Sequence, residues 1–213
     1  MELCKSKYII FDFDGVIVDS EREYYKAWKD ASIYYGYELS NEELLSLRSC
    51  DKSIASSLFN GIDNYNTVRE KRRVIMNNSL KINKFPLKKG IYELFEYLRN
   101  KGYTIIIATS SSLDMVNIHL EYYGLNKYIS EVLSVKGLKR GKPYPDIYEY
   151  ICSHYGLIPN EVLAIEDSPN GIKSAYGASC KVVMIPDLTD VTDDIKGMVA
   201  LVCKNAIDLI NYL

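Results

Sequence analysis

The sequence predicts an α/β protein: a doubly wound, mostly parallel (Rossmann-like) sheet with an inserted helical cap domain. Short apolar, β-branched runs alternate with helical patterns, which is typical of parallel strands joined by right-handed crossovers. One connection departs from this rhythm, because about 90 residues separate the first two strands where a βαβ unit takes roughly 30 in all. The 213 residues are enough for one domain with a smaller companion.

The strands are expected where apolar runs are bounded by turn residues. In chain order they are Tyr8–Asp12, Tyr103–Ala108, Val132–Val135, Val162–Glu166 and Lys181–Ile185, with a weaker sixth run at Val199–Cys203. Four helical patterns lie between them, each ending before a glycine, which is the residue that most often follows a helix. They are Leu87–Asn100, Leu113–Tyr123, Pro145–Tyr155 and Asn170–Tyr176.

The long connection is itself helical. Its helices are expected at Ser20–Tyr35, from a capping box of Ser40 and Glu43 to Leu47, from Asp51 to Asn60, and at Asn66–Ile82. We therefore expect a helical cap domain at residues 17–85 and a core domain at residues 1–16 and 86–213, joined by short hinges.

Composition excludes several classes of function. The 47% of hydrophobic residues allow a sizeable core, and the net charge of -2 gives no reason to expect a nucleic-acid or membrane partner. No apolar run approaches the roughly 18 residues of a membrane span. The five cysteines form no Cys-x-x-Cys pair, and the two histidines form no metal-binding motif. We expect a cytoplasmic monomer with reduced thiols.

Polar residues follow the predicted strands at the edge where open α/β sheets bind ligands. Asp12 and Asp14 follow the first strand, Thr109 and Ser110 the second, Lys142 lies in the loop after the third, and Glu166 and Asp167 follow the fourth. The carboxylates are hard oxygen ligands, which suit Mg²⁺ and disfavour zinc or copper. The hydroxyls, backbone N–H groups and ammonium are donors that suit a phosphate.

Carboxylates with Mg²⁺ facing phosphate donors indicate phosphoryl transfer. A carboxylate can be the nucleophile through an aspartyl-phosphate, and a second carboxyl group can protonate the leaving oxygen. Asp12 and Asp14 have suitable spacing for these two roles.

Each motif also has a plain structural interpretation. Tyr8–Val18 can be a hairpin with a turn at Asp14-Gly15, and Gly141-Lys142-Pro143 can be an exposed turn. Thr109–Ser112 and Glu166–Pro169 can cap helices. The four motifs all fall at strand ends, and this coincidence favours a common site.

The four motifs, in this order, resemble those of the haloacid dehalogenase-like superfamily, and the resemblance covers essentially the whole chain. They are Asp12-Phe13-Asp14-Gly15-Val16, Ile107-Ala108-Thr109-Ser110-Ser111, Gly141-Lys142-Pro143-Tyr144-Pro145-Asp146-Ile147-Tyr148 and Ile165-Glu166-Asp167-Ser168. More narrowly, the chain is similar to the branch with a helical cap between the first two motifs, which contains sugar-phosphate phosphatases and β-phosphoglucomutases.

The resemblance implies a role for each position. Asp12 is the implied nucleophile, and Asp14 the implied acid and then base. The implied Mg²⁺ ligands are Asp12, Asp14 through its backbone carbonyl, Glu166 and Asp167. Thr109, the Ser110 backbone and Lys142 are the implied phosphate ligands.

The resemblance also bears on the choice between phosphatase and mutase. Dehalogenases and phosphonatases of the superfamily lack an aspartate at the Asp14 position, so this residue favours phosphate esters. Tyr24 stands where a mutase-like histidine is expected, and Ser49 replaces an expected glycine. Lys52 and Arg48 either meet a second phosphate group or belong to an exposed polar loop.

We therefore expect a Mg²⁺-dependent phosphatase acting on a small phosphorylated metabolite, with a sugar phosphate as the favoured substrate. A β-phosphoglucomutase-type phosphotransferase is the first alternative. A non-catalytic ligand-binding module of the same fold is the second.

Overall fold

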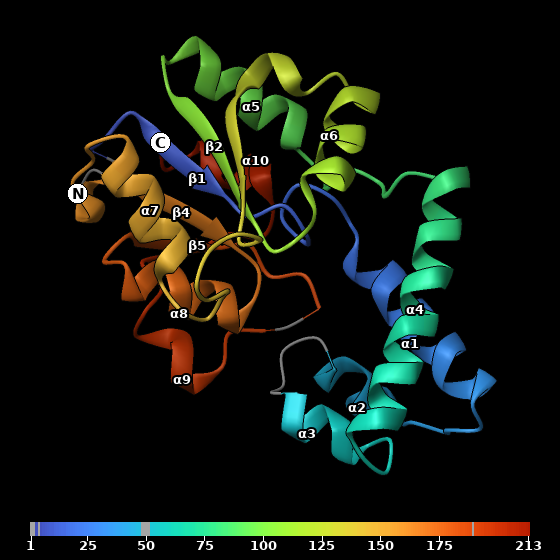
Figure 1. The fold of residues 1–213 in the computed structure, drawn as a ribbon. Coiled ribbons are helices and arrows are strands. Elements are labelled where there is room, and N and C mark those ends of the chain that lie inside the picture. The colour runs from blue at the N-terminus through green and yellow to red at the C-terminus, as the bar shows by residue number, and fades with distance from the viewer. Residues whose placement is uncertain (1–2, 4, 48–51, 189) are drawn as a thin grey trace. The chain divides into compact units, whose positions relative to one another are not determined.

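The structure is a computed structural model that describes the chain from residue 1 to 213, except for residues 1–2, 4, 48–51 and 189. It divides into two compact units, one formed by residues 1–19 and 86–213 and the other by residues 20–85 (Figure 1). The first is an α/β unit and the second is helical. Each unit is described by itself.

The α/β unit is built on a six-stranded, entirely parallel sheet. The sequence predicted a mostly parallel sheet, with the sixth strand as a weaker run. The strands lie in the order β3-β2-β1-β4-β5-β6. Their bounds are β1 Tyr8–Phe11, β2 Thr104–Thr109, β3 Ile129–Ser134, β4 Leu163–Glu166, β5 Lys181–Met184 and β6 Leu201–Val202. The first strand of the chain is therefore central, with β2 on one side and β4 on the other.

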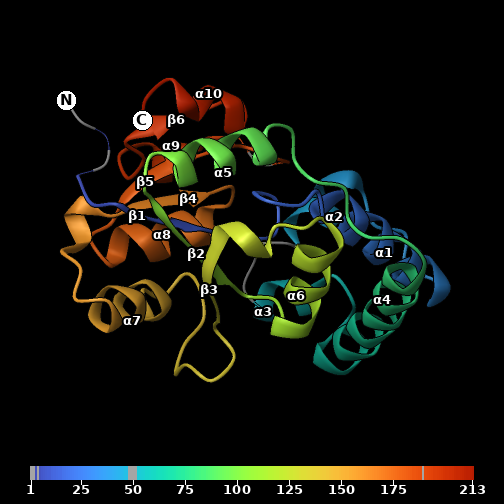
Figure 2. The ribbon, with the colours of Figure 1, turned by 90° about the horizontal axis from the view of Figure 1, so that it is seen from above.

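Helices cover both faces of this sheet (Figure 2). Their bounds are α5 Ile91–Asn100, α6 Leu113–Tyr122, α7 Asp146–His154, α8 Pro169–Gly177, α9 Asp193–Lys196 and α10 Ala206–Ile210. Alternate residues of β1 face opposite layers, as the pleat of a strand requires. Phe11 meets Phe95 of α5 edge to face at 5.1 Å. Ile10 belongs to the apolar cluster that contains Ile147 of α7 and Ile172 of α8.

Element bounds differ from the sequence prediction where local geometry intervenes. Helix α5 begins at Ile91 and not at Leu87, because Gly90 precedes it with a φ of 88°, a left-handed conformation. Strand β3 begins three residues before the predicted Val132, since it lies at the sheet edge and is only partly buried, which weakens its apolar signal. The short helices α9 and α10 were not predicted.

The chain after β1 does not form the alternative hairpin. β1 pairs in parallel with β2 and β4, and the segment that follows turns back on itself through bonds from the Ile17 N–H to the Phe13 carbonyl (2.9 Å) and from the Gly15 N–H to the Val18 carbonyl (2.9 Å). The two segments that lead to and from residues 20–85 are bonded to each other. The Asp19 N–H donates to the Pro86 carbonyl at 2.7 Å.

The helical unit has its own core. Its helices are α1 Glu21–Tyr34, α2 Asn41–Ser46, α3 Lys52–Ser57 and α4 Ile62–Ile82. The capping box expected at the start of α2 is present, with the Ser40 hydroxyl accepting from the Glu43 N–H and the Glu43 carboxylate accepting from the Ser40 N–H. Trp28 of α1 stacks against Phe59 and Tyr65, with ring centroids about 6 Å apart.

Two further expectations concern cysteines and membranes. The described cysteines Cys152, Cys180 and Cys203 are buried free thiols, and the Cys152 Sγ lies 4.0 Å from the Cys180 Sγ. Among the described helices, none combines the length and the apolar character that crossing a membrane demands.

Candidate active site

Two carboxylates meet at the carboxyl ends of the central strands. Asp12 directly follows β1, and Glu166 is the last residue of β4. These strands are parallel neighbours with Phe11 opposite Ile165, and the Asp12 N–H donates to the Ile165 carbonyl at 2.9 Å. The strand order reverses between β1 and β4, which is the place where open α/β sheets bind ligands.

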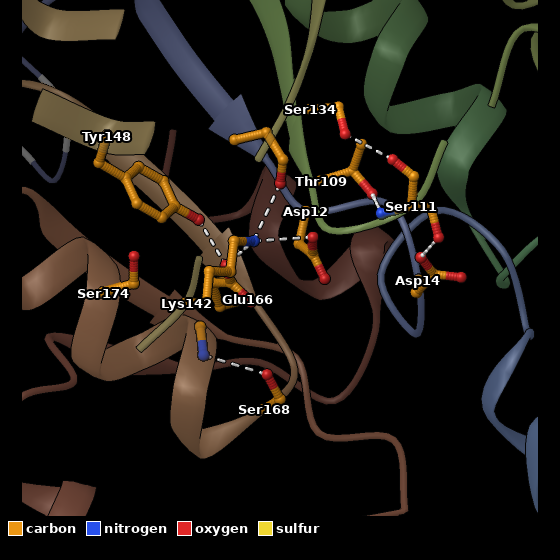
Figure 3. Close-up of polar contacts among 12 residues, drawn as sticks. Asp12, Asp14, Thr109, Ser111, Ser134, Lys142, Tyr148, Glu166, Ser168 and Ser174 are labelled. Carbon is orange, nitrogen blue, oxygen red and sulfur yellow. Dashed lines mark hydrogen bonds and ion pairs between the residues drawn. The ribbon is translucent and has the colours of Figure 1, made fainter. Parts of the chain in front are cut away.

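Lys142 joins these two carboxylates (Figure 3). Its ammonium donates to Asp12 Oδ1 at 2.8 Å, to Glu166 Oε1 at 2.6 Å and to the Ala108 carbonyl at 2.9 Å. A lysine has three N–H donors, so these three bonds use all of them. The Lys142 side chain is only 6% exposed, which places the ion pairs in a region of weak solvent screening.

The site carries an excess of buried negative charge. Asp12, Glu166 and Asp167 each bring one carboxylate oxygen to within 4.8 Å of the others, and all three are buried. One lysine against three carboxylates leaves two negative charges when all are ionised. Burial, with the Asp12 charge adding and Lys142 opposing, raises the pKa of Glu166 to about 7. Burial would lower the pKa of Lys142, but the Asp12 and Glu166 carboxylates outweigh it and raise this pKa.

The acidic cluster fits a divalent cation. Glu166 Oε2 is buried and has no hydrogen-bond partner among the described residues, although a buried carboxylate oxygen is costly to leave without one. Two glycines leave room around the carboxylates, because a Cβ at Gly171 would lie 1.9 Å from Glu166 Oε2 and one at Gly15 would lie 2.2 Å from Asp167 Oδ2. An all-oxygen set with two uncompensated charges suits Mg²⁺.

The donor groups expected after β2 lie in two different environments. Thr109 is fully buried and its hydroxyl accepts from the Ser111 N–H at 2.9 Å, whereas Ser110 is exposed. The Ser111 hydroxyl donates to Asp14 Oδ2 at 2.6 Å, and the Ser134 hydroxyl donates to the Ser111 carbonyl at 2.7 Å. The loops after β1 and β2 are thereby tied to each other and to the end of β3.

Sequence reasoning did not assign Ser111, Ser134 or Tyr148 to the site. Tyr148 of α7 is fully buried, and its hydroxyl donates to Glu166 Oε1. Burial, with Glu166 and Asp12 adding, raises the pKa of Tyr148 well above its ordinary value, so the hydroxyl stays a donor. Ser111 and Tyr148 fall within the recognised motifs, but nothing in their spacing indicates which way their hydroxyls point.

The structural interpretation of the fourth motif, that it caps the next helix, is correct for Ser168. Ser168 caps α8, since its hydroxyl accepts from the Gly171 N–H at 3.2 Å. The two carboxylates before it, Glu166 and Asp167, belong to the acidic cluster instead. The fourth motif therefore both starts a helix and supplies acidic groups.

The expected residues of the helical unit are less fully described. Arg48 lies outside the described residues, as does Ser49, and Lys52 is the first residue of α3 with its side chain outside the description. Tyr24 of α1 lies near Phe85, with ring centroids 6.0 Å apart.

Comparison with solved structures defines the class of fold. A haloacid dehalogenase-type hydrolase of family IA from Entamoeba histolytica superposes with a TM-score of 0.79 over 97% of this chain and 99% of its own, at 22% identity. This likeness establishes the α/β fold with a six-stranded parallel sheet.

Comparison with known sequences defines the family. The model of the haloacid dehalogenase-like hydrolase family matches residues 9–185. A protein of Drosophila melanogaster named probable pseudouridine-5′-phosphatase is 30% identical over 87% of this chain and 84% of its own length. A phosphorylated carbohydrates phosphatase of Thermotoga maritima is 25% identical over 80% of each chain.

The chain belongs to the haloacid dehalogenase-like hydrolase family. The resemblance seen in the four motifs is thus confirmed, and so is the expectation of an enzyme. The expected class, phosphoric monoester hydrolases, is the class of these named phosphatases.

Proposed function

We propose that this protein is a Mg²⁺-dependent phosphatase that hydrolyses a small phosphate monoester, in particular a sugar phosphate, through an aspartyl-phosphate at Asp12. The observation that carries the proposal is the meeting of Asp12, Glu166 and Lys142 at the carboxyl ends of β1 and β4. The named phosphatases among the relatives support a small phosphorylated substrate.

Asp12, Glu166, Asp167 and the backbone carbonyl of Asp14 would hold Mg²⁺. The bound ion would neutralise the excess carboxylate charge and stabilise negative charge on the phosphoryl oxygens. Thr109 and the Ser110 backbone would bind the same phosphoryl group, and Lys142 would bind it by exchanging one of its three protein acceptors for a phosphoryl oxygen. Lys142 is well suited to this, because its raised pKa keeps the ammonium charged at any working pH.

In the first step, an Asp12 carboxylate oxygen attacks phosphorus and the bond from phosphorus to the ester oxygen breaks. Asp14 donates a proton to the departing oxygen, which leaves as an alcohol. In the second step, Asp14 accepts a proton from a water molecule that attacks phosphorus. The bond to Asp12 then breaks and inorganic phosphate leaves. The Ser111 hydroxyl, 2.6 Å from Asp14 Oδ2, would hold this carboxyl group in place between the steps.

In the same proposal, residues 17–85 form a cap domain that excludes water and selects the leaving group. The structure separates the helical unit at residue 20, three residues beyond the proposed boundary. The enzyme would work as a monomer in the cytoplasm, a compartment in keeping with the free thiols of Cys152, Cys180 and Cys203.

The test is phosphate release from p-nitrophenyl phosphate with Mg²⁺, and its loss in Asp12→Asn. We expect at least a ~10³-fold fall in kcat, because the amide is a poor nucleophile and the covalent route closes. Lys181→Gln, a change at the start of β5, serves as the control and should retain full activity. An Asp12→Asn protein that is folded and as active as the wild type would contradict the assignment of the nucleophile.

Product analysis with β-glucose 1-phosphate separates phosphatase from mutase. A phosphatase releases glucose and inorganic phosphate, whereas a mutase yields glucose 6-phosphate. Formation of glucose 6-phosphate would replace the proposed hydrolysis with an intramolecular transfer. No turnover of any phosphate ester, with or without Mg²⁺, would favour the non-catalytic alternative.

A further inference from the structure

The Tyr148 ring packs in an apolar cluster, while its hydroxyl reaches the polar site. The ring lies in the cluster formed by residues such as Ile10, Ile106 and Ile172, and the side chain is fully buried. A phenylalanine would fill the same space without a hydroxyl to satisfy. The hydroxyl therefore has a specific partner, which is Glu166 Oε1.

The two oxygens of Glu166 are treated differently by their surroundings. Oε1 accepts from the Tyr148 hydroxyl and, at 2.6 Å, from the Lys142 ammonium. Oε2 is buried, accepts no hydrogen bond from the part of the chain that the structure describes, and lies against Gly171, where a Cβ would come within 1.9 Å. Oε1 therefore accepts two hydrogen bonds, whereas Oε2 accepts none from the described residues.

Lys142 by itself would hold this carboxylate loosely. Its ammonium is shared among Asp12, Ala108 and Glu166, and a single compact donor does not fix the plane of a carboxylate. The Tyr148 hydroxyl comes from α7, whereas Lys142 comes from the loop before that helix (Figure 3). Two donors from different elements fix the rotation that one donor leaves free.

We propose that Tyr148 is a positioning residue that turns Glu166 so that Oε2, and not Oε1, binds the divalent cation. This inference rests on the proposed function, since it assumes that Asp12, Glu166 and Asp167 hold Mg²⁺. Tyr148 acts through Glu166 and touches neither substrate nor cation. Partners behind metal ligands typically change metal affinity 10- to 100-fold when they are removed.

The experiment measures Mg²⁺ affinity by isothermal titration calorimetry on the full chain without substrate. Tyr148→Phe should bind Mg²⁺ about tenfold more weakly, and saturating Mg²⁺ should restore most of its phosphatase kcat. The control is Tyr155→Phe, because the Tyr155 hydroxyl also donates to a glutamate, Glu131 Oε2 at 2.6 Å, outside the acidic cluster. Tyr155→Phe should retain wild-type affinity. Wild-type affinity in folded Tyr148→Phe would overturn the inference.

A double-mutant cycle tests whether Tyr148 acts through Glu166. In the Glu166→Gln background, Tyr148→Phe should cause no further loss of Mg²⁺ affinity, since the ligand that it positions is gone. A further tenfold loss in that background would show that Tyr148 acts by another route and would overturn the inference.

A second variant changes the surroundings of Oε2 directly. It tests the inference even if Tyr148→Phe does not fold. Gly171→Ala places a methyl group where Oε2 lies and should also weaken Mg²⁺ binding. Gly177→Ala in the same helix is its control, because a Cβ there would lie 3.5 Å from the nearest atom. Unchanged affinity in Gly171→Ala would exclude Oε2 as the ligand atom.

The inference and the proposed function fail in distinguishable ways. If wild-type protein binds Mg²⁺ and Asp167→Asn weakens that binding while Tyr148→Phe does not, only the role of Tyr148 is wrong. If the wild type does not bind Mg²⁺, or if Asp167→Asn leaves the affinity unchanged, the proposed metal site itself is wrong.

Discussion

The two units of the chain differ in the kind of groups that they bury. At the end of the sheet in the α/β unit, carboxylates, a lysine and a tyrosine hydroxyl form a connected buried network. The core of the helical unit is apolar and aromatic, built around Trp28, Phe59 and Tyr65. A buried polar network costs desolvation free energy that an apolar core does not. The comparison favours the α/β unit as the place of the proposed reacting groups, while the core of the helical unit is held mainly by aromatic packing.

The largest effect should come from breaking the polar network at Lys142. Lys142→Met leaves Asp12 and Glu166 without their shared counter-ion, and removing one partner of a buried ion pair typically costs about 3–5 kcal/mol of unfolding free energy. Activity should fall about 10²- to 10³-fold, since a proposed donor to the transferring phosphoryl group is lost. Urea unfolding without metal and kcat/KM measure the two effects.

Lys173→Met is the matched control for this change. Lys173 pairs with Asp194 at 2.6 Å on the surface, where ion pairs contribute about 1 kcal/mol or less. Equal losses of stability in the two variants would mean that the buried network is no different from a surface pair. Full activity in Lys142→Met would contradict the proposed role of Lys142 in binding the phosphoryl group.

The next largest effect should come from the aromatic core of the helical unit. Trp28 is 5% exposed and stacks on two rings, so Trp28→Ala should cost about 3–5 kcal/mol of unfolding free energy in that unit. Limited proteolysis should show earlier cleavage within residues 20–85. Mg²⁺ affinity should stay unchanged, because the acidic cluster lies wholly in the α/β unit. A Mg²⁺ affinity that falls in parallel with stability would contradict the claim that the acidic cluster does not depend on the core of the helical unit.

The smallest effect should be a dependence of Mg²⁺ binding on pH. In the metal-free protein the pKa of Glu166 is raised to about 7, so the carboxyl group is largely protonated at lower pH and must lose its proton to bind the ion. Affinity should rise as the pH approaches 7, by up to tenfold per pH unit, and then level off. The same raised pKa makes stability depend on pH, because the folded state favours the protonated form of Glu166. The free energy of unfolding of the metal-free protein should therefore fall as the pH rises from about 4.5 through 7.

Calorimetry in buffers of different ionisation enthalpy measures the proton release directly. Close to one proton per Mg²⁺ is expected at pH 6 and almost none at pH 8. Glu166→Gln, which has no proton to lose at this position, should show no release at either pH. A release that is the same at both pH values would assign the proton to another group.

The sequence predicts most of the sheet, and the reason is physical. Strands β1, β2, β4 and β5 are buried on both faces, so they are apolar runs with sharp ends. The edge strand β3 contains Glu131 and is partly exposed, which blurred its start. Helix α4 begins at Ile62 and not at Asn66, because Gly61 allows the preceding chain to turn sharply with a φ of 126°.

The residues of the candidate site also fall into two groups, those that the sequence predicts and those that it does not. Asp12, Glu166 and Lys142 were found from the sequence because strand ends converge at one edge of a parallel sheet. The hydroxyls of Ser111 and Tyr148 were not, since their partners Asp14 and Glu166 are distant in the chain and the direction of a side chain depends on tertiary packing. Position along the chain predicts which backbone segments meet, but not which hydroxyl completes the network.

The central place of β1 has a consequence for synthesis of the protein. The strand is synthesised before its two neighbours in the sheet, which begin only at Thr104 and Leu163. Until both have emerged, Ile9, Ile10 and Phe11 lack the partners that bury them in the finished molecule. A nascent chain arrested before β4 therefore carries an apolar strand with an open edge, which makes it a natural client for chaperones.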